Sequence, residues 1–147
     1  MKYTMEVDID APVEAVAAVA SQPAEWKNWL EGLKEFEHLG GADGRAGARY
    51  RLVFQTGRME MDFTAEILES ELPEVMRMQM DACNLLATTT THLRPVAAGR
   101  TRYTSEQEFA FKGVFNKVIG FLLQREFKAQ TRRHMANFKR LVEAHAR

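Results

Sequence analysis

The C-terminal part of the sequence constrains the fold more than any other segment. After Gly113, apolar side chains recur at helical spacing almost to the end of the chain. About thirty residues at 1.5 Å each predict one rod of roughly 45 Å, which must lie across a broad surface to be buried. We expect Gly120 to mark a point of close packing inside this helix. Its predicted buried side comprises Phe115, Ile119, Leu122, Leu123, Phe127, Thr131, Met135, Phe138 and Leu141.

The middle of the chain supplies such a surface, because apolar and polar residues there alternate with the period of half-buried strands. The clearest run covers residues 59–67, in which every second residue is apolar. Further strands are predicted over residues 49–55, 76–81, 84–93 and 101–111. Their short connections favour pairing of successive strands, which predicts an antiparallel meander of about six strands.

The N-terminal segment predicts one strand and two short helices. Alternation over residues 3–9 predicts the strand, and residues 10–12 supply an aspartate cap and a first-turn proline for a helix. Residues 21–23 end that helix and open a second one, which carries Trp26 and Trp29. The chain therefore predicts an α+β fold, in which a curved antiparallel sheet grips one long C-terminal helix.

Composition indicates an ordinary globular protein, and we expect residues 1–147 to form one domain. The chain is 46% hydrophobic and 27% charged, with a formal net charge of zero, so no global field attracts nucleic acid. The single cysteine, Cys83, is compatible with a reducing compartment. Residues 1–10 lack a signal-peptide core, and the apolar stretch at 114–123 is half the length of a membrane span. We expect a cytoplasmic protein without a membrane span.

Four short segments, taken in order, resemble the START, polyketide-cyclase and birch-pollen-allergen superfamily of helix-grip proteins. They are residues 7–16, the Trp26 and Trp29 pair, residues 47–50, and Gly113 before the last helix. The resemblance covers essentially the whole chain. It implies a deep apolar pocket between sheet and helix, used in the family for lipids, sterols, polyketides and hormones. It implies no particular activity, because this fold carries transporters, cyclases and regulators alike.

One helix does not cover every inward side chain of so wide a sheet, so either a dense core or a cavity lies between them. Methionines are concentrated on two adjacent strands, and their flexible thioethers suit both a well-filled core and an adaptable wall. We predict binding or transport of a small hydrophobic molecule, lipid-like or polyketide-like, with no cofactor. The predicted lining residues are Tyr50, Phe54, Met59, Met61, Phe63, Met76, Met78, Met80, Tyr103, Gln107, Phe109, Ile119, Leu122, Leu123 and Phe127.

Catalytic chemistry receives little support from the residues alone. The alternation directs the strand carboxylates outward, so no catalytic residue is predicted, and no histidine pair has the i, i+4 spacing of a helical metal site. Two alternatives stay open. A polyketide cyclase or aromatase needs an ionisable group inside, and Arg51 or His92 would supply it if the strand register were shifted by one residue.

The second alternative is a regulatory protein-interaction module that uses the basic last helix. The cations of that helix outnumber its two acids, Glu126 and Glu143, and a solvated helix surface explains the same pattern. Homodimer formation is likewise left open. The cations are Arg125, Lys128, Arg132, Arg133, Lys139, Arg140 and Arg147.

Overall fold

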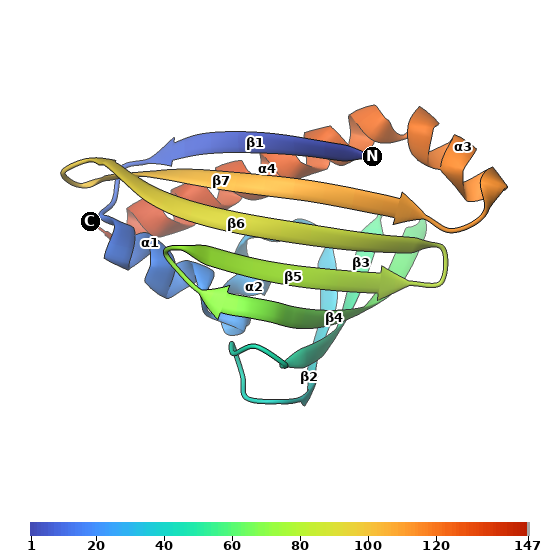
Figure 1. The fold of residues 1–147 in the computed structure, drawn as a ribbon, viewed down its shortest axis with the longest axis horizontal. Coiled ribbons are helices and arrows are strands. Elements are labelled where there is room, and N and C mark those ends of the chain that lie inside the picture. The colour runs from blue at the N-terminus through green and yellow to red at the C-terminus, as the bar shows by residue number, and fades with distance from the viewer. Residues whose placement is uncertain (147) are drawn as a thin grey trace.

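The computed structural model describes residues 1–146 and consists of one sheet with helices on its concave side (Figure 1). Arg147, one of the predicted cations, lies outside the described residues. The strands are β1 (Lys2–Ile9), β2 (Leu33–Gly40), β3 (Arg49–Thr56), β4 (Met59–Glu71), β5 (Val75–Ala82), β6 (Leu85–Ala97) and β7 (Arg100–Phe111). The helices are α1 (Val13–Ala20), the 3₁₀ turn η1 (Pro23–Glu25), α2 (Trp26–Trp29), α3 (Val114–Leu122) and α4 (Gln124–His145).

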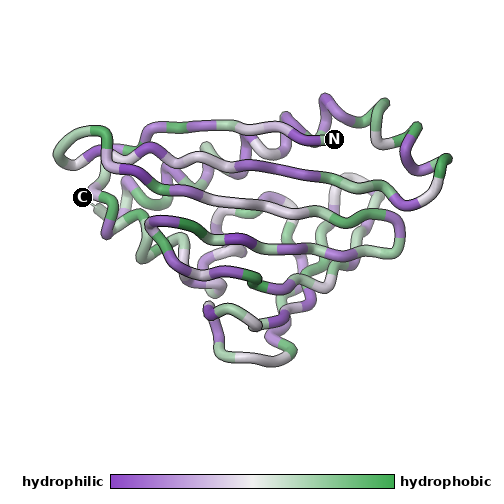
Figure 2. Tube along the Cα trace, in the orientation of Figure 1, coloured by the Kyte–Doolittle hydropathy of each residue, from purple (hydrophilic) through white to green (hydrophobic). Residues whose placement is uncertain are grey.

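The predicted antiparallel meander is confirmed. The strands are ordered β1-β7-β6-β5-β4-β3-β2, and every neighbouring pair is antiparallel. Six strands follow one another along the chain, and β1 closes the other edge by pairing with β7. Hydrophilic and hydrophobic residues alternate along the strands in Figure 2, as period-two burial of one face requires. The helix-grip architecture predicted from the sequence is therefore present.

Helix α4 lies across the concave face beside β1 and β7 (Figure 1). Its residues Thr131, Met135, Phe138 and Val142 are buried, at the three- and four-residue spacing of one helix face. The Phe138 ring is fully buried, 5.0 Å from the Trp29 ring and 5.1 Å from the Tyr103 ring between centroids. Phe138 thus ties α4 to α2 on one side and to β7 on the other.

The prediction of one continuous C-terminal helix is wrong in one respect, because the helix is interrupted at Leu123. That residue has φ −93° and ψ 6°, outside the helical region, and separates α3 from α4. The position of α3 is explained by close packing at Gly120. A side-chain carbon on Gly120 would come within 2.3 Å of the Phe111 ring, so α3 lies directly against the end of β7. Close packing at Gly120, as predicted, is confirmed.

Strand β2 is the one strand that no sequence pattern located. It pairs only with β3, at the edge of the sheet, and its residues 34–39 are all exposed. In an edge strand that is largely exposed on both faces, burial does not require apolar and polar residues to alternate. Its side chains therefore carry no period-two signal.

The grip of α4 on the sheet predicts a large difference between two phenylalanines. Phe138→Ala should lower the free energy of unfolding by about 3–5 kcal/mol, because it removes a fully buried ring and leaves a cavity. Phe121→Ala, in α3, should change it by less than about 0.5 kcal/mol, because that ring is 76% exposed. Urea unfolding of both variants measures this, and equal losses would contradict the assigned role of Phe138.

Candidate ligand-binding cavity

The strand registers bring the predicted lining residues onto one face of the sheet in rows that cross the strands. One row is Tyr50, Ala65, Met80, Ala87 and Phe109. The next is Ile67, Met78, Thr89, Gln107 and Tyr3. The concave face therefore has an apolar, methionine-rich half on β3–β5 and a half with hydroxyl and amide groups on β6, β7 and β1.

The space between this face and α4 differs from one end to the other. At the end that holds Phe138, the facing residues Leu93 and Tyr103 are buried. Towards α3, inward-facing apolar side chains are only half-buried although they lie on the concave face. They are Met61, Met78, Met80, Phe109, Phe111 and Phe127. Water therefore reaches inward-facing apolar side chains at the α3 end.

Polar side chains of β6, β7 and β1 form two separate hydrogen-bonded groups on the concave face. Thr89 donates to Gln107 Oε1 at 3.0 Å, and Gln107 Nε2 donates to Ser105 Oγ at 2.7 Å. The Tyr3 hydroxyl lies 2.7 Å from Thr131 Oγ1 and donates to the Phe127 carbonyl at 3.2 Å, which joins β1 to α4. These groups offer a bound molecule both donors and acceptors without any formal charge.

The interior stays uncharged because its phenols hold their protons and the nearby charged groups face outward. Burial raises the pKa of Tyr103 to about 12. Arg51 lies on the outer face, 2.8 Å from Asp62, and His92 lies on that face 3.8 Å from Glu106. Neither candidate for a shifted register reaches the interior, so the predicted register is correct.

One titratable group inside was missed by the sequence analysis. His134 shares a face of α4 with Phe127, seven residues before it, and Phe138, four residues after it. Burial lowers the pKa of His134, with smaller opposing contributions from Glu31. Among residues 1–146, two buried side-chain nitrogens have no hydrogen-bond partner, His134 Nε2 and Trp29 Nε1. The helical spacing of Phe127, His134 and Phe138, seven and four residues apart, was the signal in the sequence that could have indicated a buried histidine.

Two of the fifteen predicted lining residues do not line the interior. Met59 begins β4 beside the β3–β4 turn and is 58% exposed, because the sheet ends there. Leu122 is 72% exposed, as is most of the apolar surface of α3, and Phe115 of the predicted buried helix side is 76% exposed. Ile119 and Leu123 are half-buried. The helical spacing was correct, but α3 turns its apolar residues away from the sheet.

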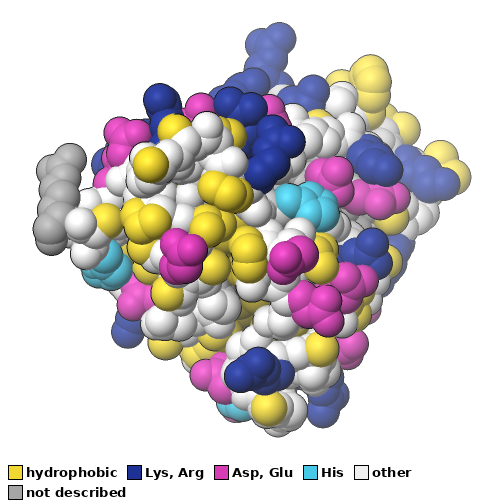
Figure 3. All heavy atoms as spheres, turned by 60° about the vertical axis from the view of Figure 1, so that its left-hand side comes forward, with side chains coloured by type: hydrophobic (Ala, Val, Ile, Leu, Met, Phe, Trp, Pro, Cys, Tyr) yellow, Lys and Arg dark blue, Asp and Glu magenta, His cyan; other side chains and the backbone are white. Residues whose placement is uncertain are grey.

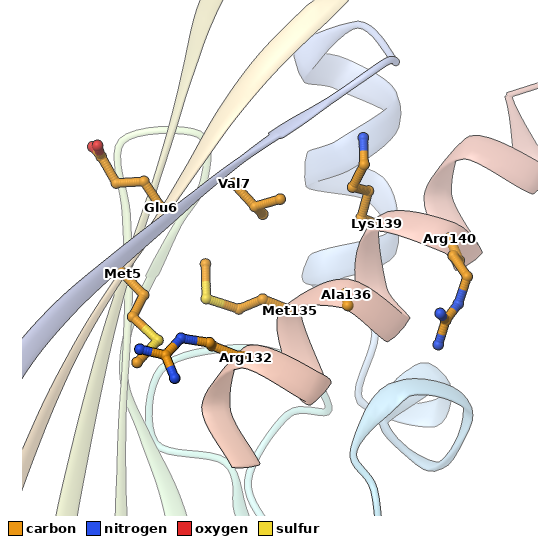
Figure 4. A pocket seen from close by; sticks show the side chains of 8 residues that line it. All are labelled: Met5, Glu6, Val7, Arg132, Met135, Ala136, Lys139 and Arg140. Carbon is orange, nitrogen blue, oxygen red and sulfur yellow. The ribbon is translucent and has the colours of Figure 1, made fainter. Parts of the chain in front are cut away.

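A separate groove lies between the edge strand β1 and α4, with a volume of about 490 Å³ (Figure 4). Met5 and Met135 extend into it from the two elements, and Arg132 lies beside Met5. A second hollow of about 340 Å³ is lined by Ser21, Asp43, Gly44, Arg45, Ser70 and Leu72. Neither contains a predicted lining residue, so both are distinct from the α3 end of the interior.

Within the described part of the chain, no group of three His, Cys, Asp or Glu side chains is arranged to hold a metal ion. Cys83 is exposed in the β5–β6 turn. No helix formed by residues 1–146 combines the length and apolar character needed to cross a membrane.

Comparison with known proteins agrees with this architecture. Residues 1–143 match the family described as polyketide cyclase / dehydrase and lipid transport. The chain is 17% identical to the protein TTHA0849 of Thermus thermophilus, with a TM-score of 0.84 and full coverage of both chains. It is 12% identical to the Zhui aromatase/cyclase of a Streptomyces species, with a TM-score of 0.82 over 100% of this chain and 96% of that one.

A third similar structure is norcoclaurine synthase of Thalictrum flavum in complex with dopamine and hydroxybenzaldehyde. It is 18% identical, with a TM-score of 0.75 over 99% of this chain and 87% of that one. A search of curated protein sequences finds no match. At these identities the solved structures establish the fold of the chain and not its activity.

The buried imidazole predicts a pH dependence of stability. Because the pKa of His134 is lowered from 6.5 in the folded chain, the unfolded chain binds this proton first as pH falls. The free energy of unfolding should therefore decrease as pH drops below 6.5, by about 1.4 kcal/mol for each unit of pKa lowering. His134→Gln should flatten this part of the curve.

Unfolding curves at several pH values and an NMR titration of His134 provide the measurement. Asp8, whose pKa is lowered from 3.8 by its hydrogen bond to Arg102, contributes only at more acidic pH. A measured His134 pKa at or above 6.5 would show that the ring is not buried as described.

Proposed function

The chain belongs to the polyketide cyclase / dehydrase and lipid transport family, and from that premise we propose that it binds a small hydrophobic molecule between the sheet and α4. The site is the α3 end of the interior, among Met78, Met80, Phe109, Phe111 and Phe127. The bound molecule extends from the apolar half of the concave face to the polar half.

The observation that carries this proposal is the half-buried state of apolar side chains that face inward. In a filled core such side chains are packed by neighbours and excluded from water. Here Met78 and Met80 lie on the concave face in the middle of the sheet and are still reached by solvent. A ligand that covered them would gain hydrophobic free energy of about 25 cal/mol for each Å² removed from water.

The lining chemistry favours an uncharged molecule with an apolar body and one or two oxygen functions. The methionines adapt to different shapes because their side chains are unbranched and polarisable. Gln107 and Thr89, on the neighbouring strands, meet a hydroxyl or a carbonyl equally well. A charged ligand group would lose its hydration in this interior without gaining a charged partner.

A second candidate function is catalysis, and one observation favours it. His134 lies on α4 four residues before the buried Phe138, and its Nε2 is buried without a partner. A neutral imidazole that keeps a lone pair near pH 7 accepts a proton from a hydroxyl or an activated carbon of a bound molecule. Passive binding returns the ligand chemically unchanged, whereas catalysis returns a product, so mass spectrometry of the released molecule separates the two functions.

Paired methionine variants test the location of the site. Met78→Lys should weaken binding of the uncharged fluorescent probe N-phenyl-1-naphthylamine by at least about tenfold, because it places a charge against the apolar wall. Met59→Lys should leave binding unchanged, because Met59 is 58% exposed outside the interior.

Fluorescence titration measures both variants, and circular dichroism confirms that each is folded. Met78→Gln, which keeps the length of the side chain, serves as a second variant if the lysine destabilises the domain. Equal probe affinity for wild type, Met78→Gln and Met59→Lys would place the site elsewhere.

A further inference from the structure

Helix α3 has the reverse of the usual distribution of residues on a surface helix. Five large apolar residues point outward: Val114 at 81%, Phe115 at 76%, Val118 at 55%, Phe121 at 76% and Leu122 at 72% exposed. At 100° per residue they occupy one arc of about 120°. Hydrophobic residues accordingly gather in α3 at one end of the molecule in Figure 2.

The inward side of α3 comprises Gly120, Asn116 and the half-buried Ile119. Gly120 is the buried residue of the helix and presses on the Phe111 ring, and Asn116, four residues earlier, donates to the Lys112 carbonyl. Helix α3 therefore rests on β7 at Gly120, with its apolar arc in solvent. A contiguous apolar surface of this kind is uncommon on a soluble monomer and marks an interaction site.

The chain is rich in cations in and next to α3. Between residues 112 and 132, Glu126 is the one acid against five cations, Lys112, Lys117, Arg125, Lys128 and Arg132. Lys112 pairs with Asp81 at 2.6 Å, and Lys128 lies over the Tyr3 ring at 5.7 Å. The ion pairs among residues 1–146 involve none of Lys117, Arg125, Lys128 and Arg132.

On the face that Figure 3 shows, Lys and Arg side chains gather along the upper part. The apolar arc consequently belongs to a cation-rich stretch of the chain, and four of its five cations have no acidic partner in the described residues. This combination matches the surface of a bilayer that contains anionic lipids, whose acyl chains accept the apolar arc and whose phosphates accept the cations.

We propose that α3 docks the protein peripherally on an anionic lipid surface, with Phe115 and Phe121 inserted at the headgroup boundary and Lys117 and Arg125 beside the phosphates. Docking brings the α3 end of the interior to the bilayer, because Phe111 contacts both α3 and the apolar end of the concave face. This placement would allow a lipid-like ligand to exchange between the site and the membrane. The exchange rests on the proposed function.

Sedimentation with vesicles tests the docking surface. Wild-type protein should bind phosphatidylcholine vesicles containing phosphatidylglycerol and bind pure phosphatidylcholine vesicles more weakly, with the difference reduced by salt. The double variant Phe115→Ser/Phe121→Ser should bind at least about tenfold more weakly to both, because two exposed rings no longer insert. Lys117→Glu should weaken binding to the anionic vesicles only.

Leu39→Ser, at a residue 45% exposed on β2, is the matched control and should bind vesicles like wild type. Absence of wild-type binding to either vesicle, or an unchanged double variant, overturns the proposal. So does light scattering that shows a dimer which Phe121→Ser converts to a monomer, since the arc then belongs to a second copy. Vesicle binding without any binding of the fluorescent probe contradicts the proposed function alone, and the reverse result contradicts the docking alone.

Discussion

The packing of α4 on one end of the sheet determines what the rest of the fold can do. Phe138 is fully buried between Trp29 and Tyr103, so α4 is held firmly against β7 and α2 at that end. A straight helix on a curved, seven-stranded sheet does not contact the whole concave face. The uncovered part lies towards α3, where inward-facing methionines and phenylalanines are half-buried. The same constraint that stabilises the domain thus leaves an accessible apolar surface inside it.

The chemistry of that surface is set by strand alternation. Because the acidic and basic residues of the strands alternate with apolar ones, they fall on the outer face, where Arg51 and Asp62 pair in solvent. The inner face keeps thioethers, rings, hydroxyls and one amide. His134 is the exception, and it comes from α4 and not from the sheet. The proposed binding and the alternative of catalysis therefore depend on different elements, so a substitution can test one without the other.

Much of this arrangement could be predicted because strand alternation is a local property of the chain. Burial of one sheet face fixes the period, so the inward positions from Tyr50 to Phe109 follow from spacing alone. The prediction that Met59 lines the interior was wrong, because the period-two alternation of residues does not reveal where the sheet ends. The break at Leu123 and the outward turn of α3 depend on contact between Gly120 and Phe111, which are nine residues apart, and helical spacing is the same on either side. The excess of cations in the C-terminal helical segment could be seen in the sequence, whereas the outward position of the apolar residues of α3 could not.

The most direct test of the account is methionine-methyl NMR of the protein during titration with a small apolar alcohol. The methyl groups of Met61, Met78 and Met80 should shift in a saturable way, because these residues line the α3 end of the interior. Those of Met59, at the strand end, and of Met5 and Met135, in the groove between β1 and α4, should not. Saturable shifts confined to Met5 and Met135, or no shift at any methionine, would contradict a binding site at the α3 end of the concave face.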